Sequence, residues 1–137
     1  MTNSLGELRV LAVEDNFTAL ALLRTMLADI GVNQVFTAKD GKEALDFLGA
    51  ADDMIDIVLC DWKMPRMTGL DLLQQVRTVD PDIPFIMITG NADKESIMAA
   101  KNVGVTSYIA KPYSSKHLEK KLRALSRIVA LRAEGKS

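Results

Sequence analysis

Residues 55–65 read Ile-Asp-Ile-Val-Leu-Cys-Asp-Trp-Lys-Met-Pro, and this stretch decides the fold. Its apolar, β-branched beginning predicts a buried strand that ends at Asp61. Pro65 and then Gly69 interrupt the pattern, so we expect a loop after the strand. An acid at the carboxyl end of a central strand stands where open α/β sheets bind ligands, although a lone Asp could also be a turn residue or a helix cap.

Strand patterns and helical patterns alternate five times along the chain. The expected strands cover residues 8–13, 34–38, 55–61, 85–88 and 107–110. The expected helices cover residues 17–30, the segment after residue 41, residues 69–79, the segment before residue 104, and residues 115–131. This order predicts an α/β fold of the flavodoxin-like type, a doubly wound five-stranded parallel sheet, (βα)5, with strand order 2-1-3-4-5.

Capping residues give some of these helices clear limits. Asn16 suits the N-cap of the first helix, and Gly31 suits its C-cap. In the third helix we expect Leu70, Leu73 and Val76 to face the core.

The length and composition suit one domain. The 137 residues are enough for one core, and 48% hydrophobic with 26% charged residues is an ordinary globular balance. We expect a single domain over residues 1–137, with a core of about residues 8–131 and flexible termini at residues 1–7 and 132–137.

The single cysteine and the lack of targeting signals bear on the compartment. Cys60 has no second cysteine to pair with and lies in the predicted central strand, so we expect a packed core thiol. No signal peptide and no run of the ~20 apolar residues needed for a membrane span is visible. We therefore expect a cytoplasmic protein without a membrane partner.

The charge is unevenly distributed although the net charge is only −1. Residues 111–137 carry a net charge of +6, and residues 1–110 carry −7. The basic last helix could be a nucleic-acid patch, a solvated face or a protein-binding face. Its basic residues flank an apolar stripe, so we expect no nucleic-acid partner, and we read His117 as a surface residue.

Polar residues follow four of the predicted strands, and the topology would bring them to one edge of the sheet. They are Glu14, Asp15, Asp61, Thr89 and Lys111. Two carboxylates ~4 Å apart repel by about 4 kcal/mol at an effective dielectric of 20, so such a cluster calls for a cation. A hard divalent ion such as Mg²⁺ suits oxygen ligands, and a metal, an amine and a hydroxyl together suit phosphoryl transfer.

Each member of this set also has an ordinary structural explanation. Glu14 and Asp15 could form a solvated loop pair, Thr89 could cap the next helix, and Lys111 could be a surface residue. The order of an acid pair, an Asp, a Thr and a Lys-Pro at successive strand ends makes coincidence a poor explanation.

At this point the sequence resembles the receiver domains of bacterial two-component response regulators, over about residues 9–131. The resemblance is carried by Val13-Glu14-Asp15, Asp40-Gly41-Lys42-Glu43-Ala44-Leu45, Asp61-Trp62-Lys63-Met64-Pro65, Met67-Thr68-Gly69-Leu70, Thr89-Gly90 and Lys111-Pro112. The Asp-Trp-x-Met-Pro run and the absence of an appended output domain make the sequence most similar to the single-domain chemotaxis members of that family.

The resemblance implies roles at the site. Asp61 would be the phosphoacceptor, and Lys111 and Thr89 would contact the phosphoryl oxygens. Mg²⁺ would be held by Glu14, Asp15, Asp61 and the backbone carbonyl of Lys63.

The resemblance also implies a switch. Thr89 and Tyr108 would change position on activation, and the Lys111–Pro112 peptide would be cis. Lys63 and Asn91 should border the path of the attacking water and modulate the lifetime of the phosphate.

Two positions depart from the common pattern of the family. Glu14 stands where Asp is commoner, and Lys63 occupies a variable position two residues after the phosphoacceptor.

The expected function is therefore a phosphorylation switch rather than an enzyme. The phosphoryl group would come from a sensor histidine kinase or a histidine-phosphotransfer protein, and self-catalysed transfer would be followed by slow autodephosphorylation. A downstream protein would bind the face of the fourth helix, fifth strand and fifth helix.

Three alternatives to a stand-alone chemotaxis regulator stay open: a phosphorelay shuttle, a phosphate-independent interaction module, and an aspartate-nucleophile phosphatase. The phosphatase would require a second acid where this chain has Lys63.

Overall fold

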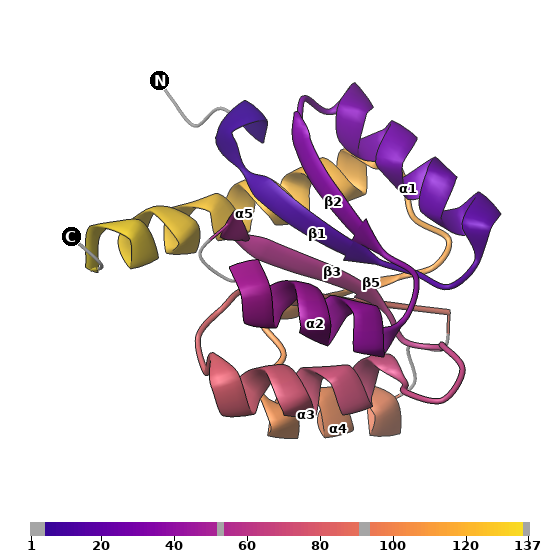
Figure 1. Ribbon diagram of the computed structural model, residues 1–137. Coiled ribbons are helices and arrows are strands. Elements are labelled where there is room, and N and C mark those ends of the chain that lie inside the picture. Colours follow the sequence, from indigo (N-terminus) through magenta and orange to yellow (C-terminus); the bar gives the residue numbers. More distant parts are fainter. Residues whose placement is uncertain (1–4, 52–53, 91–93, 136–137) are drawn as a thin grey trace.

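A computed structural model describes residues 5–51, 54–90 and 94–135. Its helices and strands alternate as the sequence predicts, apart from a short 3-10 helix before the first strand (Figure 1). The elements are η1 (Leu5–Glu7), β1 (Arg9–Val13), α1 (Phe17–Asp29), β2 (Gln34–Ala38), α2 (Gly41–Ala51), β3 (Ile57–Asp61), α3 (Gly69–Val79), β4 (Phe85–Thr89), α4 (Lys94–Val103), β5 (Ser107–Ala110) and α5 (Ser115–Gly135).

Within the described residues, the strands form one parallel sheet in the order β2-β1-β3-β4-β5. The predicted fold class and strand order are confirmed. Val13 is aligned with Cys60 across β1 and β3, and Asp61 with Ile88 across β3 and β4. This register brings the carboxyl ends of the three central strands to one level.

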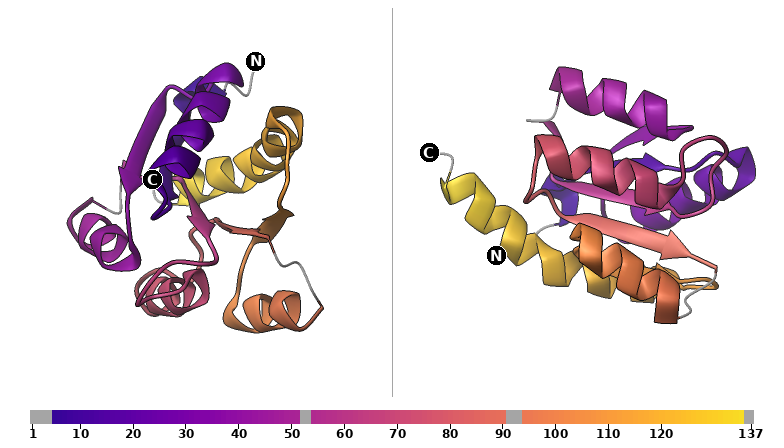
Figure 2. Two further views of the ribbon diagram at one scale, coloured as in Figure 1. Left: turned by 90° about the vertical axis from the view of Figure 1, so that its right-hand side faces the viewer. Right: turned by 90° about the horizontal axis from the view of Figure 1, so that it is seen from below.

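Helices cover both faces of the sheet (Figure 2). On one face α1 and α5 pack over the odd-numbered residues of β3, Ile57 and Leu59. On the other face α2, α3 and α4 pack over Val58 and Cys60. Because β3 is buried on both faces, its sequence is a continuous apolar run rather than an alternating one.

The predicted caps of α1 are present. The side chain of Asn16 accepts a hydrogen bond from the N–H of Ala19 at 2.8 Å. Gly31 follows the helix with φ +99°, a left-handed conformation that costs glycine least.

The structure differs from the predictions at the start of the central strand and on the buried face of α3. The central strand begins at Ile57, because Asp56 instead forms hydrogen bonds to the backbone and guanidinium of Arg9. In α3 the buried residues include Leu72, whereas Leu70 is only partly buried, because this helix packs against both α2 and α4 and needs a broad apolar face.

The described residues include parts of the chain on either side of residues 8–131. Leu5 is buried in η1, and α5 continues to Gly135. Residues 1–4 and 136–137 lie outside the described residues. Both η1 and the end of α5 lie toward the amino ends of the strands, away from the polar edge (Figure 1).

Candidate functional site

The candidate site lies at the carboxyl edge of the sheet. The elements bring together residues far apart in sequence: Glu14 and Asp15 after β1, Asp61 at the end of β3, Thr89 at the end of β4, and Lys111 after β5.

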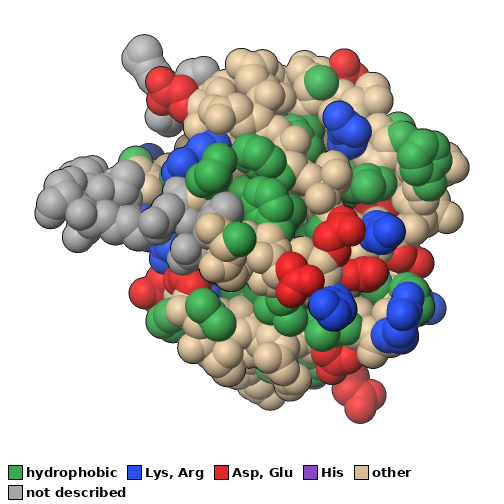
Figure 3. All heavy atoms as spheres, viewed as in Figure 1, with side chains coloured by type: hydrophobic (Ala, Val, Ile, Leu, Met, Phe, Trp, Pro, Cys, Tyr) green, Lys and Arg blue, Asp and Glu red, His purple; other side chains and the backbone are tan. Residues whose placement is uncertain are grey.

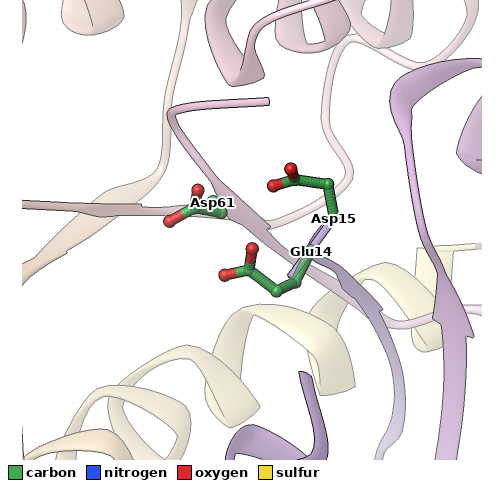
Figure 4. A group of neighbouring side chains, drawn as sticks. All are labelled: Glu14, Asp15 and Asp61. Atoms are coloured by element: carbon green, nitrogen blue, oxygen red, sulfur yellow. The ribbon is translucent and has the colours of Figure 1, made fainter. Parts of the chain in front are cut away.

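Three carboxylates converge at this edge. Figure 4 shows Glu14 and Asp15 extending from the end of β1 toward Asp61 on β3. One carboxylate oxygen from each residue lies within 4.8 Å of the others. Glu14 and Asp61 are only 7% and 5% exposed, whereas Asp15 is exposed to solvent. The cluster therefore opens to solvent on the side of Asp15.

Lys111 supplies a positive charge beside these acids. Its Nζ donates to Oδ1 of Asp61 at 2.6 Å and lies 4.0 Å from Oε1 of Glu14. Its backbone N–H donates to the carbonyl of Thr89 at 2.8 Å, and the Lys111–Pro112 peptide bond is cis. The Lys111 side chain is 40% exposed, so the amine approaches the buried carboxylates from the surface.

Burial and neighbouring charge alter the ionisation of Glu14. Burial is the main cause that raises the pKa of Glu14 above its ordinary value, and the negative charge of Asp61 adds to it. A hydrogen bond from the N–H of Asn16, at 3.1 Å, and the positive charge of Lys111 act in the opposite direction. Burial thus disfavours the ionised form of Glu14, which a cation bound beside it would favour.

A close approach at Gly69 fixes the loop after Asp61. The N–H of Gly69 donates to the carbonyl of Trp62 at 2.8 Å. A Cβ at Gly69 would lie 2.6 Å from the Asp61 carbonyl oxygen and 2.7 Å from Sδ of Met87. Only glycine fits this contact between the start of α3 and the end of β3.

Arg66 gives this loop its unusual turn. Its φ is +68°, and the N–H of Met67 donates to the carbonyl of Pro65 at 2.7 Å, a γ-turn with a left-handed central residue. The loop that follows Asp61 therefore carries backbone strain at a non-glycine residue.

The remaining predicted residues have different surroundings. Thr89 is buried, with 4% exposure, and Tyr108 is partly buried beneath the ammonium of Lys121. Lys63 is exposed. Asn91 lies outside the described residues.

Sequence reasoning missed Tyr113. Burial, together with the charges of Glu14 and Asp61, raises the pKa of this tyrosine. Tyr113 also lines a groove of about 450 Å³ between α1 and the β5–α5 loop, which Glu14 and Lys111 border as well. The only signal in the sequence was its position two residues after Lys111.

Comparison with known proteins identifies the class. Residues 10–123 match the family described as the response regulator receiver domain. The chain belongs to this family, which acts in two-component signalling. Receiver domains of this kind bind Mg²⁺ through acidic residues and interact with histidine kinases and downstream targets, and the cluster of Glu14, Asp15 and Asp61 is consistent with that property.

Within the family, the chain is similar to chemotaxis proteins. It is 38% identical to chemotaxis protein CheY-3 of Vibrio cholerae over 117 residues, which covers 84% of this chain and 88% of that protein. It is 32% identical to chemotaxis protein CheY of Pseudomonas aeruginosa over 120 residues, covering 86% and 95% of the two chains.

Solved structures agree with this assignment. CheY4 of Vibrio cholerae superposes with a TM-score of 0.79 at 33% identity, covering 85% of this chain and 97% of the other. A receiver domain protein of Clostridium thermocellum gives 0.81 at 25% identity, covering 95% and 99%. The resemblance drawn from the sequence is confirmed.

None of the helices in the described residues has the length and apolar character that crossing a membrane would take.

Proposed function

We propose that this receiver accepts a phosphoryl group on Asp61 from a sensor histidine kinase or a histidine-phosphotransfer protein. The observation that carries the proposal is the buried Asp61 carboxylate, held 2.6 Å from Nζ of Lys111 and beside Glu14 and Asp15. A buried acid with one ammonium group and two further carboxylates close to it is suited to hold an additional phosphoryl group and a metal.

The transfer needs a nucleophilic oxygen and charge neutralisation rather than a separate catalytic base. A carboxylate oxygen of Asp61 attacks the phosphorus, the P–N bond to the donor imidazole breaks, and the imidazole nitrogen keeps the electron pair. Lys111 offsets negative charge on the phosphoryl oxygens, and Thr89 offers a hydroxyl donor. The chain catalyses its own modification and afterwards loses the phosphate slowly to water.

The donor set fits Mg²⁺. Carboxylate oxygens of Glu14, Asp15 and Asp61 lie within 4.8 Å of one another, and the backbone carbonyl of Lys63 would complete the protein ligands. The raised pKa of Glu14 reflects burial and the charge of Asp61, which a cation would offset. When bound, the ion supplies positive charge next to the phosphoryl oxygens.

The signal would pass from Asp61 to Tyr108 through Thr89. Phosphorylation adds about one negative charge to Asp61, which draws the Thr89 hydroxyl and vacates space for the Tyr108 ring. To move the ratio of switched to unswitched molecules from 1:99 to 99:1, phosphorylation must favour the switched state by about 5.5 kcal/mol. Charge-assisted hydrogen bonds from Lys111 and Thr89, about 1.5–3 kcal/mol each, would supply most of it.

The downstream partner would bind the face made by α4, β5 and α5. Tyr108 lies in β5, and the α5 region carries the net charge of +6, so acidic and apolar residues on the partner would complement it. The similarity to chemotaxis proteins over 88% and 95% of their lengths supports a chemotaxis-type regulator that acts alone in the cytoplasm.

Phosphorylation of Asp61 is tested with a small phosphodonor and Mg²⁺. Intact-mass measurement should show one added phosphoryl group on the wild type and on Asp29→Asn, an exposed control. Asp61→Asn and wild type in chelator should stay unlabelled. Undiminished labelling of Asp61→Asn would place the acceptor elsewhere, and an unlabelled wild type would favour a phosphate-independent module.

Capture of partners with beryllofluoride-loaded protein then separates the two roles of a working receiver. Flagellar switch proteins are expected for the chemotaxis role, and histidine-phosphotransfer proteins would indicate a shuttle.

A further inference from the structure

Lys121 of α5 contacts two neighbouring residues of the edge strand β5. Its Nζ lies 3.0 Å from Oγ of Ser107 and 5.6 Å from the centroid of the Tyr108 ring. Lys121 is partly buried, whereas Lys116 and Lys120 of the same helix are exposed. The side chain is therefore held in one place by β5.

These contacts lie on opposite faces of the sheet. Successive strand side chains alternate between faces, so Ser107 shares the face of Ile109, which packs with α5, while Tyr108 packs on the α3 and α4 side. Lys121 leaves α5 beside the buried Leu122 and extends around the open edge of β5. The Lys121 ammonium therefore contacts both Ser107, on the α5 face of the sheet, and the Tyr108 ring, which moves in the proposed switch.

The position of the Tyr108 ring indicates which of its two positions the contact with Lys121 favours. Tyr108 is partly exposed in the structure, whereas a ring that enters the space beside the buried Thr89 would be enclosed. A ring that turned inward would leave the ammonium, because Lys121 is also bound to Ser107. A cation–π contact of this kind changes such an equilibrium by about two- to fivefold.

We propose that Lys121 is a positioning residue of the switch, which holds the Tyr108 ring outward and opposes the change that phosphorylation drives. This inference rests on the proposed function. It also gives the partner a role, since an acidic residue that pairs with Lys121 would release the ring. By linkage, the factor by which such a partner raises the affinity of Asp61 for a phosphate mimic equals the factor by which the mimic raises the affinity for the partner.

The test is beryllofluoride binding in the presence of Mg²⁺, followed by the fluorescence of Trp62. This residue is the only tryptophan and adjoins Asp61. Lys121→Met keeps a long apolar stem without the charge, and it should bind beryllofluoride about two- to fivefold more tightly than wild type. Lys121→Arg, which also places a cation over an aromatic ring, should stay near wild type, as should the control Lys116→Met.

A second measurement reports on the ring itself. The chain has two tyrosines, so 3-fluorotyrosine labelling gives two fluorine resonances, and the one absent from Tyr108→Phe belongs to residue 108. In Lys121→Met without beryllofluoride, this resonance should move toward its position in the beryllofluoride-bound wild type. In a Tyr108→Leu background, Lys121→Met should leave beryllofluoride affinity unchanged.

The outcomes distinguish the two proposals. If wild type binds beryllofluoride and Lys121→Met binds it equally or more weakly, Lys121 does not hold the ring outward. Lys121 is also excluded from that role if Lys121→Met has its full effect in the Tyr108→Leu background. If wild type itself gives no Mg²⁺-dependent response, the proposed function fails, and the inference about Lys121 fails with it.

Discussion

At the residue scale, the two consecutive acids after β1, Glu14 and Asp15, differ in solvent exposure. Glu14 is buried and accepts a hydrogen bond from the N–H of Asn16, whereas Asp15 is exposed. Burial, and then the charge of Asp61, raises the pKa of Glu14. Lys111 is too far from Glu14, at 4.0 Å, to form a hydrogen bond with it, so a bound cation would stabilise the ionised form of this buried acid.

Lys63 gives a prediction about the lifetime of the phosphate. It is exposed two residues beyond Asp61, where its methylenes could cover the phosphoryl group and its ammonium could offset phosphoryl charge. Lys63→Asn should therefore shorten the phosphate half-life several-fold, and even a tenfold change needs only ~1.4 kcal/mol. The measurement is dephosphorylation without kinase or phosphatase, with Lys39→Asn as an exposed control. An unchanged or slower rate would favour a kinase-docking role for Lys63.

Gly69 gives a prediction about stability. In Gly69→Ala the new Cβ would lie 2.6 Å from the Asp61 carbonyl oxygen, which belongs to the rigid central strand. We expect a loss of about 1–3 kcal/mol in the free energy of unfolding, measured with urea. Gly49→Ala is the matched control: it lies in α2 with nothing within 4 Å of the added Cβ, and should gain up to about 1 kcal/mol. Equal stability of Gly69→Ala and wild type would show that β3 and α3 can separate at no cost.

At the scale of elements, the end of α5 is anchored to the loop between α3 and β4. Arg132 donates to both carboxylate oxygens of Asp80, at 3.3 and 2.9 Å, and Asp80 also accepts from the N–H groups of Asp82 and Ile83. Burial alone would raise the pKa of Asp80, but the hydrogen bonds and charge of Arg132 and these N–H groups outweigh it, so the pKa is lowered. The last turns of α5 thus depend on a tertiary ion pair.

This pair predicts a pH-dependent loss of stability in Arg132→Ala. An acid with a lowered pKa stabilises the fold above its unfolded pKa, and that stabilisation is lost as the pH falls through its folded pKa. The variant should lose about 1 kcal/mol at neutral pH, and its difference from wild type should shrink toward pH ~3. Urea unfolding at both pH values checks this, with the exposed Arg127→Ala as control. A difference that does not change with pH would assign the effect to the Arg132 stem rather than to the ion pair.

At the scale of the whole molecule, charge distinguishes the faces. Over α2, acidic and basic side chains lie next to one another, as in the pair of Lys42 and Asp46 (Figure 3). The α5 region instead carries an excess of basic residues, with exposed Lys120 and Arg127. An acidic partner would therefore be attracted to α5 and not to α2.

Charge reversal tests that expectation. Lys120→Glu should slow association of the partner captured by beryllofluoride-loaded protein more than it speeds dissociation, because an exposed charge acts mainly on the encounter. The salt dependence of the on-rate should also weaken. The control is Lys39→Glu, which makes the same change of charge at an exposed residue directly after β2. If Lys120→Glu and wild type share the same on-rate at every salt concentration, the partner binds a different face.

The amino-acid sequence by itself determined the order of the elements, the parallel sheet and the residues at its carboxyl edge. Apolar runs, Asn16 and Gly31 are local signals, and right-handed crossovers leave few ways to arrange five such units. Asp61 and Lys111 were found because strand ends in this topology share one edge.

Only the tertiary structure decided how those residues meet. The contact of Lys111 with Asp61 joins positions 50 apart in the sequence, and the burial that raises the pKa of Glu14 comes from several elements at once. The contact of Lys121 with Tyr108 likewise depends on how α5 lies against the edge of β5. Local patterns specify which residues form strands and helices, but distances between side chains on different elements follow from packing, which no local signal contains.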